Sequence, residues 1–174
     1  TSSPPSELDR DMGTYAPMRA HTAHRGPDGL FWCATLSGQL FTFDPVKEEI
    51  VDRGPNWCGQ QRYTASMARS PGGRYVYYAP GAHGHGYSDG SPLIQYDTRT
   101  GTRKVLVFFF PYYFEKYGYT AGGTFSIKLD EKGERLFMVW NGAFVEHEGD
   151  VLRGDVFGQC SVMLVHIPEN ERPE

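Results

Sequence analysis

Apolar and polar residues alternate in short segments along most of the chain, and the segments end at turns rich in glycine, proline and aspartate. One strand–turn–strand pattern occurs three times, opening at Gly29, Gly73 and Gly133. Alternation with a period of two residues is typical of strands with one buried face. The loop inside the pattern lengthens each time, so function is sought in that loop. The three predicted β units span 29–44, 73–97 and 133–166.

Each unit extends to four strands when the three glycines are aligned. The strand before each glycine places Thr22, Ser66 and Ser126 at one equivalent position. The third unit ends at Pro168, so its own outer strand is missing. Apolar residues with helical spacing do not continue for more than about two turns, and the sequence therefore predicts an all-β chain. The outer strands of the first two units are expected at 49–52 and 103–107.

Two turn segments match the repeats of a known fold family. The segments Ser70–Tyr77 and Leu129–Phe137 resemble the repeats of TolB-like and WD40-like β-propellers, over about residues 18–168. The resemblance implies a β-propeller segment of about three four-stranded antiparallel blades, the last lacking its outer strand. It implies blades at about 17–54, 62–110 and 123–168, a linker or N-terminal arm at 1–16, and a C-terminal tail at 169–174.

The predicted propeller is incomplete. Three blades are fewer than the roughly 4 to 8 that close a ring. An open stack leaves strand edges unpaired, which natural proteins avoid. We therefore expect the remaining blades from a missing segment or from partner chains. The chain begins at Thr1 without a methionine, which suits either a processed mature protein or part of a longer one.

Composition excludes some partners and leaves the compartment open. With 17 basic and 21 acidic residues, the net charge of −4 has the wrong sign for a nucleic-acid binder. The apolar run Val105–Phe110 is too short for a membrane span. The count of Cys33, Cys58 and Cys160 leaves the disulfide state undetermined, and no Cys-x-x-Cys-His motif supports a haem-binding or redox propeller. A periplasmic or secreted location is favoured over a cytoplasmic one.

The elaborated loops are predicted to open on one face, which is the ligand face in the propeller families resembled. His83 and His85 are two residues apart, and in an extended segment both rings point the same way. With a third ligand such as His147 they predict a divalent metal site. The alternative is a glycine-rich loop whose histidines bond to backbone or water. The loops concerned are 56–62, 81–89, 110–119 and 141–159.

Aromatic and amide side chains in these loops suggest a saccharide-like or small ligand, because flat rings stack on the apolar faces of sugars. The competing interpretation ends the outer strand at Phe108–Phe110 and packs the tyrosines between blades. The candidate ligand-binding residues are Trp57, Gln60, Tyr112, Tyr113, Tyr117, Tyr119 and Asn141.

Acid–base residues on the same face suggest lyase or hydrolase chemistry on a carbohydrate. The candidate catalytic residues are His83 and Tyr87, with Arg62 to neutralise a uronate carboxylate. In fold and in this residue inventory the chain is weakly similar to propeller-type polysaccharide lyases. No Gly-x-Ser-x-Gly, P-loop or dinucleotide fingerprint is present. The alternative function is a non-catalytic protein-interaction propeller.

Overall fold

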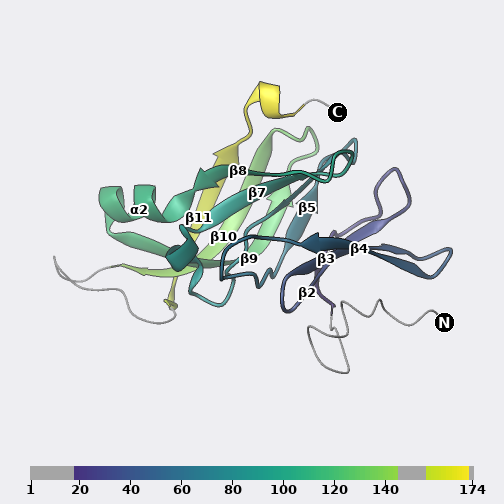
Figure 1. Ribbon diagram of the computed structural model, residues 1–174. Helices are drawn as coiled ribbons and strands as arrows, with labels where there is room; N and C mark the ends of the chain where they lie inside the picture. Colours follow the sequence, from purple (N-terminus) through teal and green to yellow (C-terminus); the bar gives the residue numbers. More distant parts are fainter. Residues whose placement is uncertain (1–17, 145–155, 173–174) are drawn as a thin grey trace.

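The computed structural model describes residues 18–144 and 156–172. These residues form eleven strands in three antiparallel sheets, with one short α-helix and two 3-10 turns (Figure 1). The prediction of an all-β chain built from antiparallel units is confirmed. Consecutive strands pair with one another in every sheet, so each sheet is a simple meander.

Sheet 1 has the strand order β1-β2-β3-β4 and sheet 2 the order β5-β6-β7-β8. Sheet 3 has three strands within the described residues, in the order β11-β10-β9. The bounds in sheet 1 are β1 Met18–His21, β2 Phe31–Thr35, β3 Gln39–Asp44 and β4 Glu49–Pro55. The bounds in sheet 2 are β5 Met67–Arg69, β6 Tyr75–Tyr78, β7 Pro92–Asp97 and β8 Arg103–Phe108. The bounds in sheet 3 are β9 Tyr119–Leu129, β10 Arg135–Phe144 and β11 Gln159–His166. The 3-10 turns are η1 Gly86–Asp89 and η2 Glu169–Glu171.

The aromatic tract after β8 is a helix, α2 (Phe109–Tyr117), and the expectation of a loop there is wrong. The extension of the outer strand through Phe110 is also wrong, since β8 ends at Phe108. Rings four residues apart contact each other along the helix in tilted pairs, with centroids 6.1 Å apart for Phe109 and Tyr113 and 5.8 Å apart for Tyr113 and Tyr117. Gly118 then ends the helix in a left-handed conformation, at φ 64°. No described helix has the length and apolarity needed to cross a bilayer.

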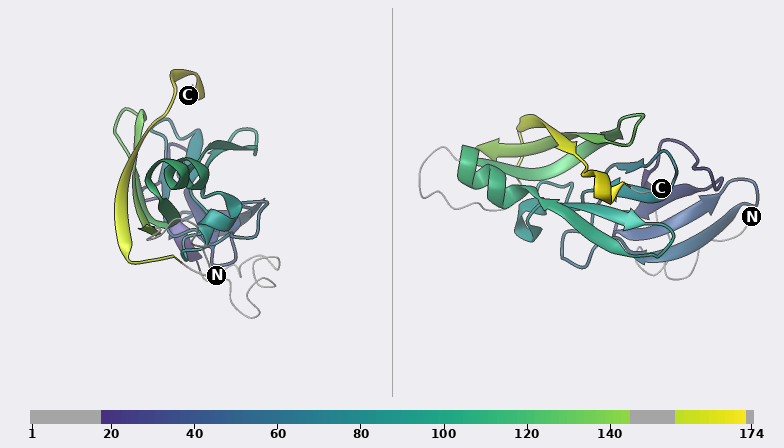
Figure 2. Two further views of the ribbon diagram at one scale, coloured as in Figure 1. Left: turned by 90° about the vertical axis from the view of Figure 1, so that its left-hand side faces the viewer. Right: turned by 90° about the horizontal axis from the view of Figure 1, so that it is seen from above.

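Sheet 2 is buried on both faces. Tyr75 and Tyr77 of β6 belong to an apolar cluster shared with sheet 3, and Val76 and Tyr78 belong to a second cluster shared with sheet 1. Successive side chains of a strand point to opposite faces, so one strand serves both interfaces. Figure 2 shows sheets 1 and 3 on opposite sides of sheet 2. The three sheets therefore stack face against face.

The first strand of each sheet, β1, β5 or β9, is named here its innermost strand, and the three lie side by side. Thr22, directly after β1, forms a parallel bridge with Met67 of β5. The amide of Ile127 in β9 donates to Ser66 Oγ, just before β5, at 3.1 Å. Two of the three positions that the sequence aligned, Thr22 and Ser66, thus make the contacts between neighbouring sheets.

One face of sheet 3 exposes apolar side chains. Its other face packs on sheet 2 through Leu136, Met138 and Trp140. The pairings of β10 with β11 place Val139 opposite Val162 and Phe137 opposite Leu164. The exposed apolar side chains of this face, named here the sheet 3 flank, are Phe125, Phe137, Val139, Val162 and Leu164.

Aspartates fix turns in all three sheets, after the third strand in sheets 1 and 2 and after the first strand in sheet 3. The Asp44 carboxylate accepts hydrogen bonds from two amides of the turn after β3, and Asp97 does the same after β7. In the turn after β9, Asp130 accepts from the Glu134 and Arg135 amides and from Arg135 Nε at 2.9 Å. The Arg135 side-chain bond is the main cause that lowers the pKa of Asp130 to about 2.

We predict that Asp130→Asn destabilises the protein at pH 7, because the amide keeps the acceptor but loses the charge. The folded-state pKa is depressed, so the contribution of Asp130 is present above pH 4 and is lost as the pH falls through about 2. The difference in unfolding midpoint between wild type and variant should narrow as the pH is lowered from 7 toward 2. Thermal unfolding measured along this series checks it.

The matched control is Glu131→Gln, an exposed residue of the same turn. It should leave the midpoint unchanged at every pH. If the unfolding midpoint of Asp130→Asn stays below that of the wild type by the same amount at every pH, the charge of Asp130 is not the cause of its contribution.

Candidate functional site

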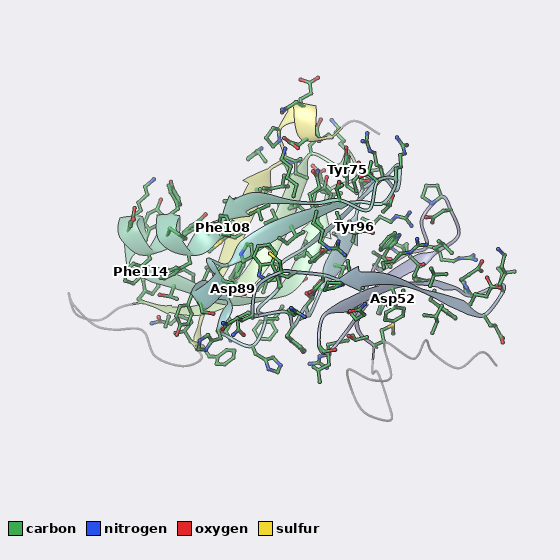
Figure 3. The ribbon with its side chains drawn as sticks, viewed as in Figure 1. Asp52, Tyr75, Asp89, Tyr96, Phe108 and Phe114 are labelled. Carbon is green, nitrogen blue, oxygen red and sulfur yellow. The ribbon has the colours of Figure 1, made fainter. Side chains whose placement is uncertain are left out.

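Loops from sheets 1, 2 and 3 meet at one end of the molecule, named here the loop end. The amides of Gly81 and Ala82 donate to the Tyr63 carbonyl at 2.7 and 3.0 Å. On the other side of the same loop, the Val156 amide donates to the Gly84 carbonyl at 2.8 Å. Figure 3 shows Asp89 on the side of the molecule where Phe108 and Phe114 lie. Backbone hydrogen bonds thus join the segment 81–89 to Tyr63, which follows the segment 56–62, and to Val156 of the segment 141–159.

A polar hollow of about 760 Å³ opens at the loop end. The turn between β2 and β3 forms one wall, and the segment between β4 and β5 forms another. Its polar side chains offer hydroxyl, amide, guanidinium and carboxylate groups. The lining residues are Leu36, Ser37, Cys58, Gly59, Gln60, Gln61, Arg62, Tyr63, Ser88 and Asp89.

Asp89 links two of the segments that line the hollow. Its Oδ2 accepts hydrogen bonds from Trp57 Nε1 at 3.0 Å and from the Gln61 amide at 2.8 Å. One carboxylate thereby fastens the segment after β4 to η1. The approach is so close that a Cβ on Gly59 would lie 2.2 Å from Trp57 Nε1. Trp57, predicted as a ligand contact, is therefore half-buried and serves the frame of the site.

Two predicted residues do present side chains to the hollow. Gln60 and Arg62 are both exposed and line it. Arg62 Nε donates to the Gly59 carbonyl at 3.2 Å, which orients the guanidinium along the segment. The Arg62 carbonyl accepts a hydrogen bond from the buried Asn56 side chain at 2.7 Å, and this bond fixes the backbone of Arg62. The hollow thus has a rigid floor with a cation and an amide at its rim.

The two histidines of the predicted metal site pack on different tyrosines. The His83 ring lies on Tyr63 with centroids 4.0 Å apart, and the His85 ring stacks on Tyr87 at 5.0 Å. Gly84 between them has φ +85°, so the segment is not the extended strand that the i, i+2 argument assumes. His147 lies outside the described residues, and no group of three metal-binding side chains occurs within them. The metal site stays a prediction.

The predicted catalytic residues fall on two sides of the loop end. His83 packs against Tyr63, which lines the hollow next to Arg62. Tyr87 lies toward α2, with its ring 5.6 Å from that of Phe110. The hollow therefore has His83 and Arg62 near one wall, and Tyr87 belongs to the aromatic cluster behind it.

The predicted aromatic ligand surface is divided between core and solvent. Tyr119 is 3% exposed, and its hydroxyl donates to the Gln159 carbonyl at 3.0 Å. Tyr113 is half-buried, and burial raises its pKa. Tyr112 and Tyr117 are each 53% exposed. Lys116 Nζ lies 5.2 Å from the centres of both exposed rings, and its hydrogen bonds to their hydroxyls raise the Lys116 pKa.

Asn141 has a structural role. Its side-chain oxygen accepts from the amides of Gly142 and Gly158, at 3.1 and 2.9 Å, and so joins β10 to the start of β11. The cysteines are all free thiols, which the count alone did not decide. Burial raises the pKa of the Cys33 thiol to about 12, whereas Cys58 is exposed at the hollow.

Sequence reasoning missed two contributors to the hollow. Tyr63 carries the His83 ring on one side, and the Arg19 guanidinium lies 5.2 Å from its ring centre. Ser37 lies in the short turn between β2 and β3, whereas the sequence prediction considered only the long loops. The only sequence signal for Tyr63 is its position shortly before the strand β5.

No protein family and no curated protein matches the chain. Solved structures do match it, among them the hydrazine synthase of Kuenenia stuttgartiensis, with a TM-score of 0.55 and 12% sequence identity. The match covers 86% of this chain and 34% of that chain, so the present chain spans about a third of its length. At this identity the likeness bears on the fold alone.

We predict that Asp89→Ala frees the segment after β4, because Trp57 and Gln61 both lose their acceptor. Hydrogen exchange at the Gln61 amide should become about tenfold faster or more, the size expected when a hydrogen bond to a charged group is lost. The Gly81 amide, bonded to Tyr63, serves as the internal reference and should keep its rate. Amide exchange followed by NMR measures both.

Glu115→Ala on the exposed surface of α2 is the matched control variant. It removes a carboxylate at the same end of the molecule without touching the hollow. An unchanged Gln61 rate in Asp89→Ala would show that other contacts hold the segment.

Proposed function

We propose that the chain forms three adjacent blades of a β-propeller whose loop end binds a small, hydroxyl-rich ligand of saccharide type in the polar hollow. The face-to-face stack of three antiparallel meanders supports the architecture, with the innermost strands side by side. Propellers place four-stranded meanders radially in this way around an axis. The likeness to part of a larger solved chain is compatible with a segment of a longer assembly.

The sheet 3 flank supports the presence of further blades. Sheet 2 shows how a central sheet of this stack is covered, since another sheet packs on each of its faces. The flank of sheet 3 offers the same kind of surface, and Val162 of its edge strand β11 is 73% exposed. We propose that its occupant is one further blade, and that a fourth strand pairs with the outer edge of β11. Natural sheets protect such edges.

The single observation that carries ligand binding is the polar hollow itself. Its wall groups match a ligand with many hydroxyls, since Ser and Gln side chains both donate to and accept from alcohols, and the Asp89 carboxylate accepts from them. The exposed guanidinium of Arg62 adds a preference for ligands that carry a carboxylate, such as uronates. A rigid floor limits the entropy lost on binding.

The proposal also includes lyase or hydrolase chemistry on a sugar bound in the hollow. His83 packs on Tyr63, which lines the hollow next to Arg62. A histidine in this position can accept a proton from a sugar that the Arg62 guanidinium holds. A divalent metal at His83, His85 and His147 is a separate proposal, and binding does not depend on it.

A second candidate function is protein docking without catalysis. The exposed rings of Tyr112 and Tyr117, with Lys116 between them, favour it. This surface fits a peptide with an apolar side chain flanked by carboxylates, because Lys116 is the nearest cation. Double substitution Tyr112→Ser with Tyr117→Ser separates the two functions, since it should leave sugar binding at the hollow intact.

We predict that Val162→Glu strongly destabilises the natural polypeptide that carries this chain. If a further blade covers the flank, the new carboxylate is buried without a partner, at a cost of about 3 kcal/mol or more. Urea unfolding of the natural polypeptide measures the change in the free energy of unfolding.

Val46→Glu is the matched control, because Val46 is 80% exposed on the turn between β3 and β4. A change there should stay within about 0.5 kcal/mol. Equal, small effects of the two substitutions would show that the flank is open to solvent. The intact mass of the natural polypeptide then tells whether the further blades are covalently attached.

We predict that Arg62→Gln weakens binding of a uronate oligosaccharide by about tenfold, through loss of a charge-assisted hydrogen bond. Binding of a neutral oligosaccharide of the same length should change less. Calorimetric titration with both sugars measures the difference between the two losses of affinity. Appearance of an unsaturated product reports lyase activity.

Arg99→Gln is the control for net charge, since Arg99 is exposed on the turn after β7 at the opposite end of the strands. If neither sugar binds to the wild type, the proposal that the hollow binds a saccharide is wrong. The proposal of a propeller architecture does not depend on this result.

A further inference from the structure

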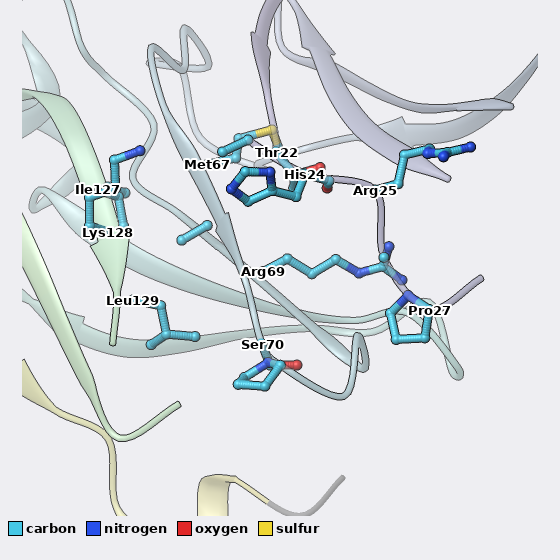
Figure 4. Close-up of a pocket in the computed structure, with 14 residues that line it drawn as sticks. Thr22, His24, Arg25, Pro27, Met67, Arg69, Ser70, Ile127, Lys128 and Leu129 are labelled. Carbon is cyan, nitrogen blue, oxygen red and sulfur yellow. Dashed lines mark hydrogen bonds between the residues drawn. The ribbon is translucent and has the colours of Figure 1, made fainter. Parts of the chain in front are cut away.

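A second hollow lies at the opposite end of the innermost strands. Each of these strands runs from the loop end to a tight turn, and the turns of all three sheets meet there. The hollow has a volume of about 330 Å³ and lies between three corresponding segments of the units (Figure 4). We name it the basic hollow, and its segments are Thr22–Pro27, Met67–Pro71 and Ile127–Leu129.

Every charged side chain that lines the basic hollow is a base. Lys128 comes from β9, Arg69 from β5, and His24 and Arg25 from the chain after β1. Figure 4 shows the His24 ring and the Lys128 side chain on facing walls. Among the described residues, no carboxylate lines the hollow. This excess is notable in a chain whose overall charge is −4.

Arg69 is already neutralised. Its two terminal nitrogens donate to the Asp28 carboxylate at 2.9 and 2.6 Å, and its Nε donates to the Gly73 carbonyl at 3.0 Å. Partial burial raises the pKa of Asp28, but the Arg69 hydrogen bond and charge outweigh it and leave the pKa below its ordinary value. Asp28 is thus a fixed anion committed to Arg69 and does not compensate the other bases.

The other three basic side chains have no such ion pair, although the charge of Arg25 helps the amide hydrogen bonds of the turn to lower the pKa of Asp44. Within the described part of the chain, no carboxylate forms an ion pair with Lys128, His24 or Arg25. The hydroxyls nearby are engaged, since Thr22 Oγ1 donates to the His24 carbonyl and Ser70 Oγ accepts from the Tyr75 amide. Small side chains, Ala23 and Ala68, leave the space between the walls free. The hollow therefore combines room, positive charge and unused donors.

We propose that the basic hollow binds a small anion that carries phosphate or carboxylate groups, with Lys128 and His24 as the direct contacts and Arg25 at the rim. Two donors on facing walls suit an oxyanion with several oxygens, which accepts from both at once. Low salt should strengthen binding, since the site is partly open and its charges are screened by ions. This site is independent of the polar hollow, because it lies at the other end of the strands.

The test uses the natural polypeptide and two probes, inorganic phosphate and citrate, in calorimetric titrations at low salt. We expect Lys128→Gln to weaken binding of the responding probe by about tenfold or more. His24→Gln should weaken it as well, and the uronate sugar should bind as in the wild type. Response to phosphate alone assigns phosphate chemistry, and response to citrate alone assigns carboxylate chemistry.

Lys132→Gln is the matched control, since Lys132 is exposed in the turn after β9 and does not line the hollow. It should leave binding within about twofold of the wild type. No heat with either probe overturns the proposal, as does an equal loss in Lys132→Gln and Lys128→Gln. Lys128 is exposed, so its substitution should not unfold the protein, and Arg25→Gln provides a second variant should it do so.

Discussion

The burial of sheet 2 on both faces is the constraint on which the rest of the structure depends. A strand such as β6 contributes Tyr75 and Tyr77 to one interface and Val76 and Tyr78 to the other, so the outer sheets are placed relative to each other through it. This packing sets the innermost strands side by side. Both hollows follow from it, because the basic hollow lies between segments of all three units and the polar hollow lies between segments of the first two.

The units and their turns are readable from the sequence because they rest on local interactions. Asp44 and Asp97 bind amides two and three residues ahead, and such contacts need no distant partner. Alternation of apolar residues then gives the strand faces. The helix α2 was missed because phenylalanine and tyrosine favour strands, and the signal was instead the four-residue spacing of Phe109, Tyr113 and Tyr117.

The site was predicted less well, for reasons that lie in backbone conformation and long-range contact. The left-handed Gly84 turns His83 and His85 toward different tyrosines, and no local rule forecasts that choice. Tyr119 and Asn141 face hydrogen-bond partners on β11, which only the folded sheet brings near. Gln60 and Arg62 are exposed and line the polar hollow, because they lie in a polar segment between two strands, and their roles in binding and catalysis stay predictions.

The connection between the second and third strands of each unit grows along the chain, from the short turn after β2 to the segments that follow β6 and β10. In every case both ends are clamped by antiparallel pairing, so an insertion lengthens a chain whose anchor points are already fixed. Doubling such a loop raises its closure entropy by only about 0.6 kcal/mol. The scaffold is therefore suited to evolve new recognition by insertion, with little penalty to folding.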